Sequence, residues 1–178
     1  YLRKNVAIVL QEPFLFSRTI RENIGITAQE RDRDAMLEYV RAAARSACVD
    51  EAIEGFAQGY ETVVGERGVT LSGGQKQRVA ISRMLTKKTP VMVFDDSLSA
   101  VGTQTDEHIR EALNRDLTGT TSIIISHRIT TLMDCDNILV LEYGKVLQRG
   151  TPQQLLQQPG LFRQIYDMQM SIGEEEPA

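Results

Sequence analysis

The chain has 178 residues, of which 42% are hydrophobic, and this is enough for one globular domain with a core of its own. Its formal net charge of -4 leaves no basic surface, which excludes nucleic-acid binding driven by neutralisation of phosphates. Its apolar runs are far shorter than the roughly 20 residues that span a bilayer, so we expect no membrane-spanning helix.

The first predicted element is a strand over Val6–Leu10. This continuous run of aliphatic residues is typical of a parallel strand that is buried in a sheet. It stops at Gln11, which is followed by Glu12 and Pro13. Gln11 is therefore expected in a loop directly after a core strand.

The next segment, from Thr19 to about Glu61, contains no strand pattern. Apolar residues recur at three- and four-residue spacing over Asp32–Cys48, as in a helix with one buried face. We predict a mostly helical insert that forms a separate lobe.

The stretch "GVTLSGGQKQR" runs from Gly68 to Arg78 and predicts the start of a helix that continues to Leu85. Ser72 and Gln75 have the spacing of a capping box, in which each side chain binds a backbone N–H of the opening turn. Gly73 and Gly74 leave the other N–H groups uncovered, and the positive end of a helix dipole attracts anions. The alternative is an ordinary capped surface helix with a flexible start.

Two further strands are predicted over Val91–Phe94 and Thr121–Ser126, and a helical pattern over Thr105–Leu117 lies between them. Strands that alternate with helices indicate an α/β fold with a parallel sheet.

Polar residues follow both strands at the sheet edge where α/β proteins bind ligands. Asp95 and Asp96 come directly after "VMVF", and a Mg²⁺ ion needs only one or two carboxylates besides phosphates and water. Asp95 could bind the metal and Asp96 could activate water, unless the pair merely caps a turn. His127 could reach a phosphate from the next strand, or it could be a structural histidine.

The C-terminal part predicts a hairpin and a final helix. Tyr143 and Gly144 separate two alternating stretches between Asn137 and Gly150, and helical spacing follows over Leu161–Met170. The acidic stretch from Gly173 is expected to be a frayed natural C-terminus.

Read in order, these motifs resemble the nucleotide-binding domain of ATP-binding cassette (ABC) transporters, and the likeness covers nearly the whole chain. The segment Thr62–Gly68, "TVVGERG", resembles the loop before the signature in exporter-type members. The motifs that carry the resemblance are "QEPFLF" (Gln11–Phe16), "LSGGQ" (Leu71–Gln75), "VMVFDD" (Val91–Asp96) and "SHR" (Ser126–Arg128).

The resemblance implies an α/β fold that is part of a RecA-like P-loop NTPase core. The core would consist of residues 1–18 and 91–172, with its parallel sheet. An ABC helical subdomain carrying the signature would be inserted at about 19–90, and 173–178 would be a tail.

The resemblance also implies ATP as the nucleotide and Mg²⁺ as its metal. Gln11 would be the Q-loop glutamine that senses the metal and the γ-phosphate, and Asp95 would be the Walker B magnesium ligand. Asp96 would occupy the position of the catalytic base, and His127 that of the switch histidine.

Two further groups would face other parts of a transporter. Ser72, Gly73, Gly74 and Gln75 would bind the γ-phosphate of ATP held by an opposite nucleotide-binding subunit, and a D-loop over Ser99–Gly102 would cross to that subunit. Phe14–Phe16 would lie near the coupling helices of a transmembrane domain.

Three features depart from the family pattern. No G-x-x-x-x-G-K-S/T phosphate loop is present, so we expect a fragment that is inactive alone. Asp96 stands where a glutamate is usual, and Gly102 where an aspartate is usual. These changes resemble the degenerate half of a heterodimeric exporter.

We therefore expect the ATP-hydrolysing part of an ABC exporter at the cytoplasmic face of a cell membrane. Its partners would be a transmembrane domain and a second nucleotide-binding domain, in a homodimer or, preferentially, a heterodimer, with no nucleic acid. The alternatives are a regulatory half-site that binds ATP without hydrolysing it, and an ABC ATPase that is not linked to transport. The transported substrate is not encoded in these residues.

Overall fold

The computed structural model describes residues 1–28, 32–65, 69–87, 89–99, 102–116 and 119–173. The chain divides into two compact units, Tyr1–Ile125 and Ser126–Ala178. Parts of three predicted features lie outside the described residues: 66–68 before the signature, 100–101 in the D-loop, and 174–178 in the tail.

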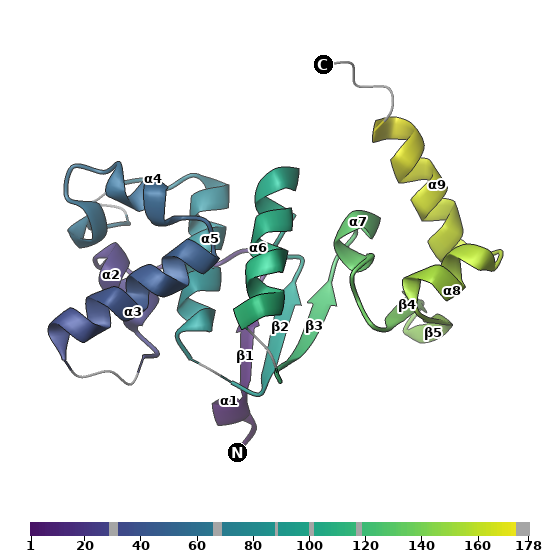
Figure 1. Cartoon of the computed structure of the whole chain (residues 1–178), viewed down its shortest axis with the longest axis horizontal. Helices are drawn as coiled ribbons and strands as arrows, with labels where there is room; N and C mark the ends of the chain where they lie inside the picture. Colours follow the sequence, from purple (N-terminus) through teal and green to yellow (C-terminus); the bar gives the residue numbers. More distant parts are fainter. Residues whose placement is uncertain (29–31, 66–68, 88, 100–101, 117–118, 174–178) are drawn as a thin grey trace. The chain divides into compact units, whose positions relative to one another are not determined.

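The first unit contains a three-stranded sheet and the helical segment (Figure 1). Its elements are α1 (Leu2–Asn5), β1 (Val6–Val9), α2 (Ile20–Gly25), α3 (Arg33–Ser46), α4 (Asp50–Glu54), the 3-10 helix η1 (Gly59–Glu61), α5 (Gly73–Leu85), β2 (Val91–Asp95), α6 (Thr103–Asp116) and β3 (Thr121–Ile125).

The sheet has the strand order β1-β2-β3, and both neighbouring pairs are parallel. Ile8 pairs with Val93, and Val93 pairs with Ile123, so these three residues lie side by side across the sheet. The predicted α/β fold with a parallel sheet is confirmed. Because consecutive parallel strands are joined by right-handed crossovers, α5 and α6 both lie on one face of the sheet.

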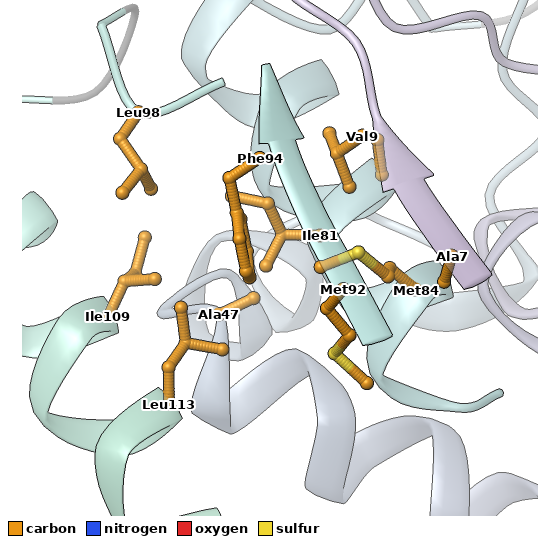
Figure 2. Packing of buried hydrophobic residues seen from close by; sticks show 11 residues of the cluster. Ala7, Val9, Ala47, Ile81, Met84, Met92, Phe94, Leu98, Ile109 and Leu113 are labelled. Carbon is orange, nitrogen blue, oxygen red and sulfur yellow. The ribbon is translucent and has the colours of Figure 1, made fainter. Parts of the chain in front are cut away.

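That covered face holds the main hydrophobic cluster (Figure 2). Phe94 and Met92 from β2 are each 1% exposed and pack between the two helices. The helices contribute Ile81 from α5 and Ile109 from α6, which are both fully buried.

The opposite face of the sheet differs from the prediction. The aliphatic runs predicted strands buried on both faces, but Ile8 is 55% exposed and Ile123 and Ile125 are each 48% exposed. Both connecting helices lie on the other face, so the described residues of the first unit provide no layer here.

The helical segment has a hydrophobic cluster of its own, built around Ile20, Ile24 and Val40. The helix α5 joins it to the sheet, because Val79 belongs to this cluster while Ile81 belongs to the cluster under the sheet. The predicted helical character of this segment is confirmed for its described residues, whose β-pairing consists of the isolated bridges Thr19–Val63 and Val64–Val69.

The described residues of the second unit form a hairpin and three helices, which share a hydrophobic cluster. Its elements are α7 (Ile129–Leu132), β4 (Ile138–Glu142), β5 (Lys145–Gly150), α8 (Pro152–Gln157) and α9 (Leu161–Gly173). The strands are antiparallel, and Tyr143 and Gly144 form the turn with φ of 47° and 75°, which confirms the predicted hairpin. Among the described residues, no helix has the length and apolar character needed to cross a bilayer.

Candidate functional site

The first element of the site is the carboxyl edge of the sheet, where β2 ends. Asp95 is the last residue of this strand, is half-buried, and pairs with Ile125 of β3. Its carboxylate makes no hydrogen bond with any described residue, so both oxygens can accept a ligand. The part of the chain that the structure describes has no group of three metal-binding side chains. One or two carboxylates fit Mg²⁺, which keeps several waters and phosphate oxygens as further ligands.

Asp96 follows in a left-handed conformation, with φ of 44°. Its N–H donates to the carbonyl of Ile125 at 2.9 Å, and its carbonyl accepts from the Ser99 hydroxyl at 2.7 Å. An aspartate tolerates this region of backbone space better than most residues. The tight turn therefore holds the Asp96 carboxylate at the strand end.

Gln11 reaches Asp96 from the end of β1. Its amide Nε2 donates to Asp96 Oδ2 at 3.1 Å, although the two residues are 85 positions apart. Asp96 Oδ1 is buried and has no hydrogen-bond partner in the described structure. The fold thus brings Gln11 to Asp96, directly after Asp95 at the end of β2.

The second element of the site is the N-terminus of α5. Ser72 Oγ accepts from the N–H of Gln75 at 3.2 Å, and Gln75 Oε1 accepts from the N–H of Ser72 at 2.9 Å. The predicted capping box is therefore confirmed, and the helix starts at Gly73. Gly73 is exposed, and a Cβ added there would meet no atom within 4 Å. No acidic residue occupies the first turn, so the positive end of the dipole is not neutralised.

These two elements lie at the same end of the first unit. Figure 1 shows that α5 runs antiparallel to the strands, so its first turn lies at the end where β1 and β2 stop. A direct contact joins them, because the buried Gln77 side chain donates from Nε2 to the carbonyl of Leu10 at 3.1 Å. Oxygen ligands and the N-terminus of α5 are therefore found at one end of this unit.

A groove of about 360 Å³ lies beside β1, between that strand and α5. Phe14 and Phe16 line it, with their rings edge to face at 5.1 Å, and Phe14 is 69% exposed. Arg83 of α5 also lines the groove, and burial lowers the pKa of its guanidinium. Sequence reasoning missed Arg83 and Gln77, because in the sequence they are ordinary polar residues of a helix.

The remaining predicted residues belong to other segments of the chain. Gly102 is exposed at the start of α6, where its carbonyl accepts from the N–H of Asp106. His127 belongs to the second unit and is exposed, and its carbonyl accepts from Gln169 Nε2 at 2.8 Å. A joint role of His127 with Asp96 stays a prediction.

Comparison with known proteins identifies the family. Residues 1–99 match the family model described as ABC transporter, which is more than half of the chain. The chain belongs to the ABC transporter family. The family assignment predicted from the motifs is therefore confirmed.

Relatives and a solved structure extend this ABC transporter match to nearly the whole chain. The chain is 42% identical to an ATP-dependent lipid A-core flippase of Chromohalobacter salexigens, over 97% of this chain and 29% of the flippase. It is 44% identical to an uncharacterised ABC transporter ATP-binding protein of Bacillus subtilis, over 94% of this chain and 28% of that protein.

The fold matches the structure of a bacterial Atm1-family ABC exporter with ATP bound, with a TM-score of 0.87 and 40% identity. That match covers 95% of this chain and 29% of the exporter chain. The predicted fold class is confirmed. The chain thus spans less than a third of the length of these relatives.

Proposed function

We propose that this chain is part of the ATP-hydrolysing domain of an ABC exporter, which couples hydrolysis to movement of a substrate across a membrane. The observation that carries the proposal is the hydrogen bond from Gln11 Nε2 to Asp96 Oδ2 at the carboxyl edge of the sheet. It places an amide and two adjacent carboxylates where α/β proteins bind their ligands.

In this proposal Asp95 and the Gln11 side-chain oxygen would hold Mg²⁺, which would supply positive charge to neutralise the phosphates of bound ATP. Asp96 would orient the attacking water through its carboxylate. Gln11 holds Asp96 Oδ2, which limits how far the carboxylate can turn. Because aspartate is one methylene shorter than glutamate, the water is held at a poorer distance and hydrolysis here is slow.

The exposed N–H groups of the first turn of α5 serve a different nucleotide in the same proposal. Ser72, Gly73, Gly74 and Gln75 bind the γ-phosphate of ATP held by a second nucleotide-binding domain. The neutral capping box supports this role, because Gln75 completes the cap without placing a negative charge beside the phosphate. With the slow site at Asp96, the arrangement favours a heterodimer in which the partner performs most hydrolysis.

The groove beside β1 is the proposed contact with a transmembrane domain. Two exposed aromatic rings next to a cation suit the insertion of a short helix from a neighbouring domain. Such a partner would place this chain at the cytoplasmic face of a membrane.

The proposal is tested by measuring phosphate release from MgATP by the purified exporter that contains this chain. We expect Asp95→Asn to weaken the dependence on Mg²⁺ at the site of this chain. The matched control is Asp136→Asn, which changes an exposed aspartate of the second unit. An exporter without ATPase activity, or an Asp95→Asn variant with an unchanged Mg²⁺ dependence, would contradict the proposal.

A further inference from the structure

Two polar side chains of α5 hold the segment that follows β1. Gln77 is 1% exposed, and its Nε2 donates to the carbonyl of Leu10 at 3.1 Å. Arg83 donates from Nη1 to the carbonyl of Phe14 at 2.8 Å. The two bonds therefore bracket Gln11, the residue that contacts Asp96.

Arg83 makes further contacts that tie this segment to a second helix. Its Nε donates to the carbonyl of Asn23 at 2.7 Å, its Nη2 donates to Asn23 Oδ1 at 2.9 Å, and its guanidinium lies 5.6 Å from the ring centre of Phe16. These acceptors are uncharged amide oxygens. A planar guanidinium carries N–H donors in a fixed forked arrangement and can donate to all of these oxygens at once. The ammonium group of lysine cannot reproduce that arrangement.

Asn23 completes the network from α2. It is fully buried, its Oδ1 accepts from the N–H of Phe16 at 2.8 Å, and its Nδ2 donates to the carbonyl of Phe16 at 2.9 Å. Nδ2 also donates to the carbonyl of Thr19 at 3.0 Å. Both backbone groups of Phe16 are thus held by one side chain, which Arg83 in turn fixes to α5.

We propose that Gln77 and Arg83 are positioning residues that attach the segment Leu10–Phe16 to the signature helix α5. A displacement of α5 by a nucleotide at its first turn then moves Gln11 and the aromatic groove together with the helix. Most hydrogen bonds of this network end on backbone atoms. Because a hydrogen bond depends on distance and angle, it fixes the position of the backbone more tightly than apolar packing does. Its consequence for ATP turnover rests on the proposed function, but the attachment itself does not.

The attachment is tested on the 178-residue chain by amide hydrogen exchange, with Arg83→Met as the variant. We expect exchange of the Phe16 amide to rise about tenfold, because Asn23 loses the group that orients its Oδ1. The amides of Val79 and Ile81 within α5 should change less than about twofold. The control is Arg45→Met on α3, an arginine whose side chain is 54% exposed and whose Nη2 lies 4.0 Å from Glu38 Oε2.

An unchanged Phe16 amide would overturn the attachment, and so would a uniform rise across α5, which would indicate general destabilisation. Gln77→Met keeps the test decisive if Arg83→Met does not fold. It removes the donor to Leu10 with little change in side-chain volume. The Gln11 side-chain amide should then become more mobile by NMR relaxation, and an unchanged amide would count against the proposal.

The consequence is tested in the exporter by kinetics. We expect Arg83→Met to lower kcat for ATP about tenfold with the KM for ATP within about twofold, because Gln11 is misplaced rather than removed. Arg83→Lys should not restore kcat, since lysine retains the positive charge but lacks the forked arrangement of N–H donors. Normal kcat with altered exchange would overturn the coupling. Absence of ATPase in the wild type would instead refute the proposed function and leave the exchange result standing.

Discussion

The two ends of the signature helix α5 are built in different ways. The first turn is exposed and is held by the reciprocal bonds of Ser72 and Gln75, three positions apart. The last turns are buried, with Ile81 and Ser82 fully inaccessible and Arg83 bonded to residues about 60 positions away.

This difference separates recognition from stability within one helix. An end that is ordered by local bonds needs no tertiary cover, so its remaining N–H groups stay open to a ligand. A helix end that is ordered by packing contributes to the hydrophobic core and leaves no room for a ligand. Changes at the first turn should therefore act on ATP turnover, and changes of the buried apolar side chains at the other end should act on unfolding.

The largest expected effect is at the buried end. Ile81→Ala removes a fully buried side chain from the cluster under the sheet, and we expect it to lower the free energy of unfolding by about 2–5 kcal/mol. Urea unfolding of the chain measures this. Ile26→Ala is the control, because Ile26 is 41% exposed. Equal losses in both variants would remove the distinction between buried and open positions.

The next effect concerns the open end. Ser72→Arg or Gly73→Asp in the exporter should reduce ATP turnover about a hundredfold, because a bulky or negative group displaces the γ-phosphate from the helix N-terminus. The unfolding midpoint should move much less than for Ile81→Ala. Gly73→Ala is the milder control, since the space around Gly73 admits a methyl group. Turnover near the wild-type rate would refute the anion site.

A smaller effect is expected at Asp96, which accepts the hydrogen bond from Gln11. Asp96→Asn should lower total ATPase only modestly, because a general base contributes about 10²–10⁴-fold at its own site and this site already contributes little. Mutation of the partner's equivalent carboxylate should be far more damaging. If Asp96→Asn abolishes steady-state phosphate release as fully, Asp96 is a competent base and the heterodimer proposal fails.

The smallest effect contrasts the neutral cap of α5 with the charged cap of α2. Hydrogen bonds from the backbone and then the side chain of Thr19 lower the pKa of Glu22 below its ordinary value of 4.5. A carboxyl group with a lowered folded pKa stabilises the protein above its unfolded pKa and loses that contribution as pH falls through the folded pKa. As the pH falls below about 4.5, the unfolding temperature of the wild type should therefore drop slightly more than that of Glu22→Gln. Parallel pH profiles would show that this cap carries no charge effect.

Local rules account for what the sequence determined by itself. The capping box at Ser72, the carboxylates at the end of β2 and the turn at Tyr143–Gly144 each depend on residues within a few positions of one another. Their geometry follows from helix ends, strand ends and tight turns, which short stretches encode. The parallel sheet could also be predicted, because strands alternate with helices along the chain.

Tertiary structure alone decided which face of the sheet is covered and which distant groups meet. Ile8 and Val9 are both aliphatic, yet one is 55% exposed and the other 3%, because both connecting helices fall on one side. Arg83 looks like a typical cation of a last helical turn until the fold brings Phe14 and Asn23 to it. Such contacts join residues that are dozens of positions apart in the sequence. No local pattern indicates which partner a buried polar group will find.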